Sequence, residues 1–184
     1  MGNFLSRKEI EQIGFQSFGK NLLLSKDAKF YNPAGISLGS NIRIDDFCIL
    51  SSGEGGIRIE NYVHIACYTS LIGKASISIG KFSNLSSRVS VYSSSDDYSG
   101  ETMTNPMVPE EFKNVHSSPV NIKEHVIIGC NATLLPGTIL NQGVAIGAYS
   151  LVKSDCKAFN LYAGIPAKKM TKRKRGLLDF SAKL

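Results

Sequence analysis

Residues 122–151 divide without remainder into the hexads IKEHVI, IGCNAT, LLPGTI, LNQGVA and IGAYSL. Each hexad begins with isoleucine or leucine and keeps an aliphatic or small residue at its fifth position. A helix face repeats every 3.6 residues and a strand face every 2, so neither alone explains a period of six. A coil of three short strands does, if each hexad forms one side and points its first side chain inward. The stretch therefore predicts a β-solenoid.

The same period runs through the earlier part of the chain, at residues 38–49, 59–76 and 79–90. Stacked coils bury a continuous core that no single coil could bury alone. Glycine and asparagine recur at second or third hexad positions, where we expect corners with positive φ, because these residues adopt it at low cost. The residues concerned are Gly39, Asn61, Gly80, Gly129 and Gly147.

The breaks in the period are also informative, because a solenoid places insertions on its surface. Residues 51–57 form a short glycine-rich break, and residues 92–119 form a long loop with three prolines. A loop of that length in a compact domain is usually functional or disordered. Ser6 and Glu9 have the spacing of a capping box that opens a short helix. We expect one all-β domain over residues 1–184: an N-terminal cap (1–20), a β-helix (21–152) and a C-terminal segment (153–184).

The composition fits a globular domain whose net basic charge is confined to one end of the chain. The chain is 42% hydrophobic and 20% charged, which excludes a disordered chain. Its net charge of +6 resides in residues 168–184, which carry seven basic side chains and one acidic one. The remainder sums to about zero, so we expect no nucleic-acid partner. No segment approaches the ~18 apolar residues of a membrane span, and the four cysteines form no CxxC pair. We expect a cytoplasmic protein without a transmembrane segment.

With its hexads, its long loop and the motifs Ile146-Gly-Ala-Tyr-Ser150 and Ala163-Gly-Ile-Pro-Ala-Lys168, the chain resembles the hexapeptide-repeat acyltransferases. It is most similar to the galactoside/maltose O-acetyltransferases and the polysaccharide and O-antigen biosynthesis acetyltransferases. The resemblance implies a left-handed parallel β-helix and a homotrimer with active sites in the clefts between subunits. It also implies acetyl-CoA as acyl donor and a sugar hydroxyl of a surface glycan, or of its precursor, as acceptor.

Three alternatives stay open. The first is N-acetylation of a nucleotide-linked amino sugar, and the second is a non-catalytic β-helix scaffold whose basic tail binds a partner. The third is a zinc-dependent carbonic anhydrase, which shares the fold and needs three histidines converging on one metal. The three histidines of this chain, His64, His116 and His125, show no such matched spacing. We therefore expect no metal.

Acetyl transfer to a hydroxyl needs a base near the nucleophile, which makes the histidines the first candidates. The related enzymes carry their catalytic histidine early in the long loop, where this chain has Asp96 and Asp97 and no histidine. His64 closes a hexad and matches a sugar-side position of the related enzymes. We therefore predict His64 as base, with Asp96 or Asp97 as its partner. His116 is the competing base, and His125 is expected on a surface corner.

The resemblance also suggests the residues that contact the two substrates. Asn84 and Tyr98 are predicted on the acceptor side. Corner backbone groups near four small residues are expected to line the pantetheine arm, and three lysines, suited to phosphate, lie where the related enzymes bind the CoA nucleotide. The predicted cofactor-binding residues are Gly129, Cys130, Gly147, Ala148, Lys153, Lys168 and Lys169.

Overall fold

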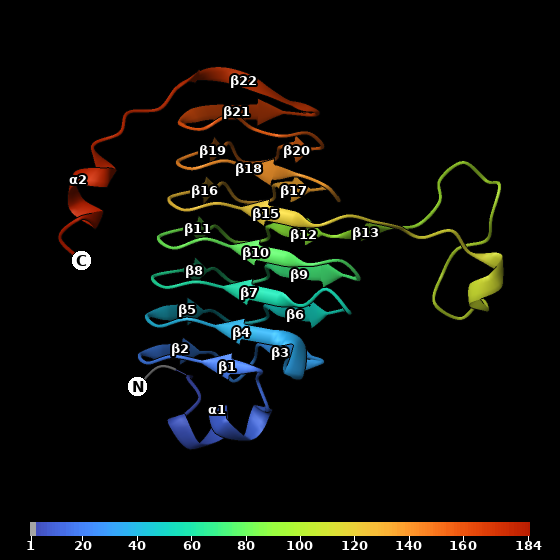
Figure 1. Ribbon diagram of the computed structural model, residues 1–184, viewed down its shortest axis with the longest axis horizontal. Coiled ribbons are helices and arrows are strands. Elements are labelled where there is room, and N and C mark those ends of the chain that lie inside the picture. Colours follow the sequence, from blue (N-terminus) through green and yellow to red (C-terminus); the bar gives the residue numbers. More distant parts are fainter. Residues whose placement is uncertain (1–2) are drawn as a thin grey trace.

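The computed structural model describes residues 3–184 and shows a three-sided β-solenoid (Figure 1). The chain runs from sheet I to sheet II to sheet III and back, so strands of successive coils pair in parallel. Sheet I contains β1 (Ser17–Phe18), β4 (Ile36–Leu38), β7 (Ile57–Ile59), β10 (Ile77–Ile79), β15 (Val120–Ile122) and β18 (Ile139–Leu140). Sheet II contains β2 (Leu22–Leu24), β5 (Ile42–Ile44), β8 (His64–Ile65), β11 (Asn84–Leu85), β16 (Ile127–Ile128), β19 (Ala145–Ile146), β21 (Asn160–Gly164) and β22 (Ala167–Lys172). Sheet III contains β3 (Lys29–Tyr31), β6 (Ile49–Ser52), β9 (Ser70–Gly73), β12 (Ser90–Tyr92), β17 (Thr133–Leu134) and β20 (Leu151–Val152).

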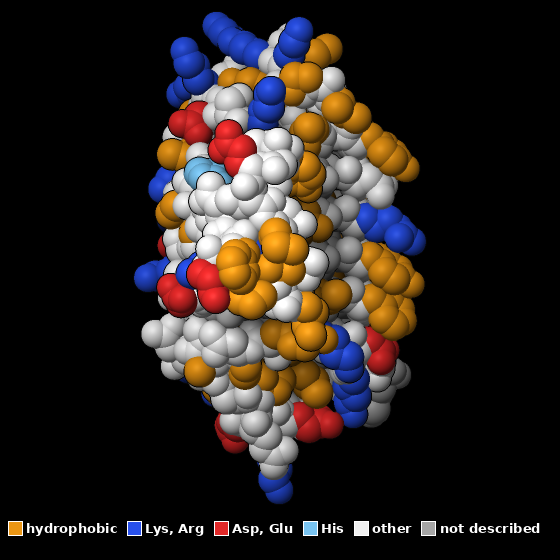
Figure 2. Space-filling model, turned by 90° about the vertical axis from the view of Figure 1, so that its right-hand side faces the viewer, with side chains coloured by type: hydrophobic (Ala, Val, Ile, Leu, Met, Phe, Trp, Pro, Cys, Tyr) orange, Lys and Arg blue, Asp and Glu red, His pale blue; other side chains and the backbone are white. Residues whose placement is uncertain are grey.

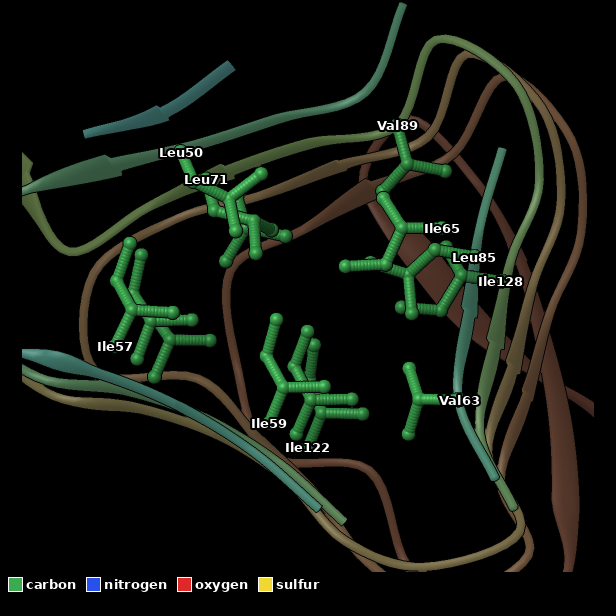
Figure 3. Packing of buried hydrophobic residues seen from close by; sticks show 14 of the residues in the cluster. Leu50, Ile57, Ile59, Val63, Ile65, Leu71, Leu85, Val89, Ile122 and Ile128 are labelled. Atoms are coloured by element: carbon green, nitrogen blue, oxygen red, sulfur yellow. The ribbon is translucent and has the colours of Figure 1, made fainter. Parts of the chain in front are cut away.

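The core consists of aliphatic side chains from the three walls, which point toward one another in stacked layers (Figure 3). The leading residue of every predicted hexad is at most 4% exposed. Complete burial of one such side chain contributes about 1.5–3 kcal/mol, so the stack of coils supplies most of the stability. The predicted parallel β-solenoid is confirmed. The leading residues are Leu38, Ile44, Ile59, Ile65, Leu71, Ile79, Leu85, Ile122, Ile128, Leu134, Leu140 and Ile146.

The corners differ from the prediction. Positive φ occurs at the fourth position of every predicted hexad except residues 71–76, where it falls on Gly73 at the third position, and none of the five predicted residues has it. Aromatic residues adopt it at Tyr62 and Phe82, although this region is unfavourable for side chains of that kind. Stacking offsets part of that cost, because the rings of Tyr62, Phe82 and His125 lie in one column with centroids 5.0 Å apart.

The second-position glycines meet a different requirement, the close approach of neighbouring coils. A Cβ atom on Gly129 would lie 2.5 Å from the backbone nitrogen of Ala148 in the next coil. No side chain fits there unless the coils move apart. Gly129 is therefore needed for coil stacking, whatever else lies against this corner.

The long loop forms an extended arm. Its base is an antiparallel ribbon of β13 (Ser94–Ser95) and β14 (His116–Ser117), and its tip contains the 3₁₀ turn η2 (Glu110–Phe112). The arm projects away from the solenoid (Figure 1), and Figure 2 views the face from which it emerges. Tyr98 and Met107 are 92% and 90% exposed, so the arm presents large apolar side chains to its surroundings.

Both ends of the solenoid are covered. Helix α1 (Arg7–Ile13) begins with the predicted capping box between Ser6 and Glu9 and packs Ile10 onto the first coil. A 3₁₀ turn, η1 (Pro33–Gly35), connects β3 to β4. After β22, Arg173 donates hydrogen bonds to the carbonyls of His125 and Gly143, and α2 (Leu177–Ser181) lies along the side of the solenoid away from the arm (Figure 1). Within residues 3–184, no helix has the length and apolar character needed to cross a membrane.

Candidate active site

A row of polar side chains crosses the outer face of sheet II. The strand register places Arg43 beside His64 and His64 beside Asn84 on β5, β8 and β11. Nδ1 of His64 lies 2.9 Å from Oδ1 of Asn84, so the structure brings these two predicted residues together. The His64 side chain is 40% exposed, which leaves its ring accessible to a substrate.

The carboxylate beside His64 is one that sequence reasoning missed. Oδ2 of Asp45 lies 2.8 Å from Nε2 of His64, and Oδ1 of Asp45 accepts a hydrogen bond of 2.6 Å from Nε of Arg43. Burial alone would raise the pKa of the Asp45 carboxyl, but the hydrogen bonds from His64 and Arg43 outweigh it and lower this pKa. His64 therefore already has a carboxylate partner within its own chain.

The arm residues predicted as that partner lie elsewhere. Asp96 and Tyr98 line a pocket of about 460 Å³ at the base of the arm, against Tyr92 of sheet III. The Asp97 carboxylate accepts hydrogen bonds from Ser99 and Thr102, which lower its pKa to about 2. Within one chain, the structure thus keeps these aspartates apart from the His64 row.

The predicted cofactor residues lie at the upper end of the solenoid. Gly129 and Cys130 follow β16, and Gly147 and Ala148 follow β19, so all four share the corner between sheets II and III. Above Asn84, the outer face of sheet II becomes apolar, with Ile127 and then Ala145 next in register. Lys153 follows β20, and Lys168 and Lys169 are exposed on β22. Basic side chains gather at this end of the molecule (Figure 2).

The other two histidines have different surroundings. His116 is exposed on β14 and pairs with Ser95 at the base of the arm. His125, expected on the surface, is only 8% exposed and stacks on Phe82, and this burial lowers its pKa. It is therefore a buried member of the corner column. Within residues 3–184, no three histidine, cysteine or acidic side chains gather in a way that could hold a metal ion.

This geometry can be compared with known proteins. No family model matches the chain. The chain is 50% identical over 179 residues to dTDP-4-amino-4,6-dideoxy-D-glucose acyltransferase from Escherichia coli. The match covers 97% of this chain and 93% of the relative. The chain belongs to the hexapeptide-repeat acyltransferase family. The predicted enzyme class, acyltransferase, is confirmed.

Two further relatives of the acyltransferase are informative. AntD, an N-acyltransferase from Bacillus cereus solved with dTDP and 3-hydroxybutyryl-CoA, has a TM-score of 0.95 and 44% identity. That match covers 100% of this chain and 96% of AntD. A putative lipopolysaccharide biosynthesis O-acetyl transferase from Escherichia coli, WbbJ, is 30% identical over 145 residues, 74% of this chain and 71% of the relative.

Proposed function

We propose that this acyltransferase transfers the acyl group of an acyl-CoA to the amine of a dTDP-linked 4-amino-4,6-dideoxy sugar. The observation that carries the proposal is 50% identity, over nearly the whole chain, to an enzyme named for that amino sugar. A mutant of AntD, matched over 97% of its length, has been solved with dTDP-4-amino-4,6-dideoxyglucose and coenzyme A. The relatives include enzymes named for each of the two predicted acceptors, a sugar amine and a sugar hydroxyl. The amine is favoured because the O-acetyl transferase is only 30% identical to this chain.

The chemistry proposed for the site is aminolysis of a thioester. The amine lone pair forms a bond to the thioester carbonyl carbon, and the carbon–sulfur bond breaks, with its electron pair leaving on the CoA sulfur. The attacking nitrogen loses a proton to His64, and the ring returns a proton to the thiolate. The transfer is complete without any redox change.

The surface of sheet II supports this arrangement. Below Ile127, the outer face carries the polar row of Arg43, His64 and Asn84, while Ile127 and Ala145 make it apolar on the next two strands. A polar nucleophile fits the lower part, and an acyl chain on its pantetheine arm fits the upper part beside Gly129 and Gly147. The two substrates would then meet near Asn84.

We further propose a homotrimer in which each arm lies against a neighbouring subunit. Asp96 and Tyr98 lie apart from His64 within one chain, which supports a site completed by a second copy. The exposed apolar side chains of Met103, Met107 and Phe112 on the arm support a contact with that copy. We place the enzyme in the cytoplasm. Cys48, Cys67, Cys130 and Cys156 are all free, as is usual for proteins of a reducing compartment.

Lys168→Ala is expected to weaken the binding of CoA, because the exposed ammonium group is proposed to pair with CoA phosphates. Added salt should weaken wild-type binding and narrow the difference between the two proteins, because charges are screened over about 8–10 Å at physiological ionic strength. Isothermal titration with CoA at two salt concentrations measures both effects. An unchanged affinity in Lys168→Ala would remove this lysine from the cofactor site.

The proposed function is tested by measuring thiol release from acetyl-CoA and longer acyl-CoA donors. The acceptors are dTDP-4-amino-4,6-dideoxyglucose, its 4-hydroxy counterpart and free sugars. We expect release only with the amino sugar, accompanied by a mass increase of the product. Thiol release with the hydroxyl acceptors and none with the amine would reverse the assignment. A protein that shows no thermal shift with any acyl-CoA would instead be a scaffold.

A further inference from the structure

We propose that Asp45 positions His64 so that Nδ1 of the ring, on the side of Asn84, is the atom that exchanges protons with the acceptor. The inference rests on the proposed function, because it assigns roles within that acyl transfer. It replaces the arm aspartates with a carboxylate of the solenoid wall.

The first step concerns the protonation of Nε2. An ionised carboxylate only accepts hydrogen bonds. Asp45 divides its two oxygens between Nε of Arg43 at 2.6 Å and Nε2 of His64 at 2.8 Å. Arg43 is a permanent donor, and the Asp45 side chain is only 18% exposed. With Asp45 ionised, the short contact to Oδ2 requires a hydrogen on Nε2.

The second step concerns the other ring nitrogen. In a neutral imidazole one nitrogen donates and the other accepts, so a hydrogen on Nε2 leaves the lone pair on Nδ1. That atom lies 2.9 Å from Oδ1 of Asn84, which can only accept a hydrogen bond and so matches the protonated ring. A carboxamide offers an oxygen acceptor on one side and an NH₂ donor on the other. In the orientation shown, Asn84 can therefore accept from the protonated ring, and after a half turn of the amide its NH₂ group can donate to the neutral ring.

The third step concerns location. Asn84 is the last polar member of the row, and Ile127 of the next coil begins the apolar strip above it. Nδ1 therefore faces the boundary where the amine and the thioester are proposed to meet. Nε2 faces away from that boundary, toward the coil below.

The arm aspartates cannot supply the same rigidity within one chain. The Asp97 carboxylate is occupied by Ser99 and Thr102, and Asp96 lies in the pocket at the arm base. Asp45, by contrast, belongs to the turn after β5, and its backbone N–H donates to the carbonyl of Ile65 at 2.9 Å. A carboxylate held in this way fixes both the tautomer and the orientation of a histidine.

The experiment uses the full-length enzyme labelled with ¹⁵N-histidine. The chain has only three histidines, so a His64→Gln sample identifies the His64 imidazole signals. In the wild type we expect the neutral ring to carry its hydrogen on Nε2. In Asp45→Asn we expect a mixture of the two tautomers and a kcat lower by roughly 10- to 100-fold, with an unchanged KM for acyl-CoA.

Asp46→Asn is the matched control. Asp46 is the next residue along the chain, but its carboxylate accepts a hydrogen bond from Ser25 and not from His64. We expect wild-type tautomer signals and wild-type kcat from this variant. If Asp46→Asn lost as much kcat as Asp45→Asn, the loss in both variants would be explained by local distortion of the turn. That result would overturn the proposal.

Asp45→Glu keeps the test decisive if Asp45→Asn does not fold. It retains the charge but displaces it by one methylene, so kcat should fall while Nε2 stays protonated. A wild-type ring with its hydrogen on Nδ1 would refute the inference, as would full kcat in both Asp45 variants. If the wild type fails to acylate the amino sugar, the proposed function fails, but the tautomer signals still decide the role of Asp45.

Discussion

His64→Ala is expected to lose about 10²- to 10⁴-fold in kcat, while its KM for acyl-CoA stays near the wild-type value. The ring lies on the polar part of sheet II, two coils below the apolar strip proposed for the acyl chain, so its removal should affect proton transfer and not donor binding. Steady-state kinetics with the amino sugar, varying one substrate at a time, separates the two effects. The core should be unaffected, because the side chain points outward.

His116→Ala is the control for that experiment. His116 is exposed at the base of the arm and should be replaceable with little loss. Near-wild-type activity in His64→Ala, with loss in His116→Ala, would transfer the base role to the arm. Full activity in both variants would mean that the amine attacks unaided and that the site only positions it.

Replacing residues 97–114 with Asn-Gly is expected to dissociate the trimer and reduce acyl transfer to background. The register of β13 with β14 makes Asp96 and Val115 the next facing pair, which a two-residue type I′ turn can join. The excised segment includes Tyr98, Met103, Met107 and Phe112. Burial of each such side chain against a neighbour would contribute about 1.5–3 kcal/mol, so three arms amount to a large part of the assembly energy.

The solenoid itself should survive this excision. No residue between 97 and 114 belongs to the buried core cluster, so the thermal unfolding midpoint of the shortened chain should reflect only the loss of assembly. Light scattering gives the mass, and the thiol-release assay gives the activity. A shortened chain that remains trimeric with wild-type kcat/KM would contradict the proposed role of the arm.

The sequence predicted the core well because burial in a solenoid depends on a strict local period. Each leading aliphatic residue is buried whatever the coils above and below contain. The corner φ values were mispredicted for a physical reason. Glycine is the least costly residue at positive φ, but the second-position glycines are needed for close contact between coils. Several of the corners with positive φ instead carry aromatic rings, whose stacking offsets part of the backbone cost.

The partner of His64 could not be found in the same way. Contacts across the wall depend on how many residues each coil contains, and that number varies. His64 pairs with Arg43, 21 residues earlier, and with Asn84, 20 residues later, while Asn84 pairs with Ile127, 43 residues later. Asp45 comes within reach of His64 only because of this register, so a pattern of hexads could not indicate it.

Those unequal spacings share one origin. The turn η1, the break at residues 53–56, the extra residues before β10 and the whole arm all connect sheet III to sheet I. The other two corners keep their short turns from coil to coil. The variation in coil length is therefore confined to the edge between sheets III and I. The strands of sheet II keep the same alignment in space whatever the length of those connections. Evolution can lengthen, shorten or recombine segments along this edge while the His64 wall stays in place. A designer seeking to graft new recognition loops onto the scaffold would begin at the same edge.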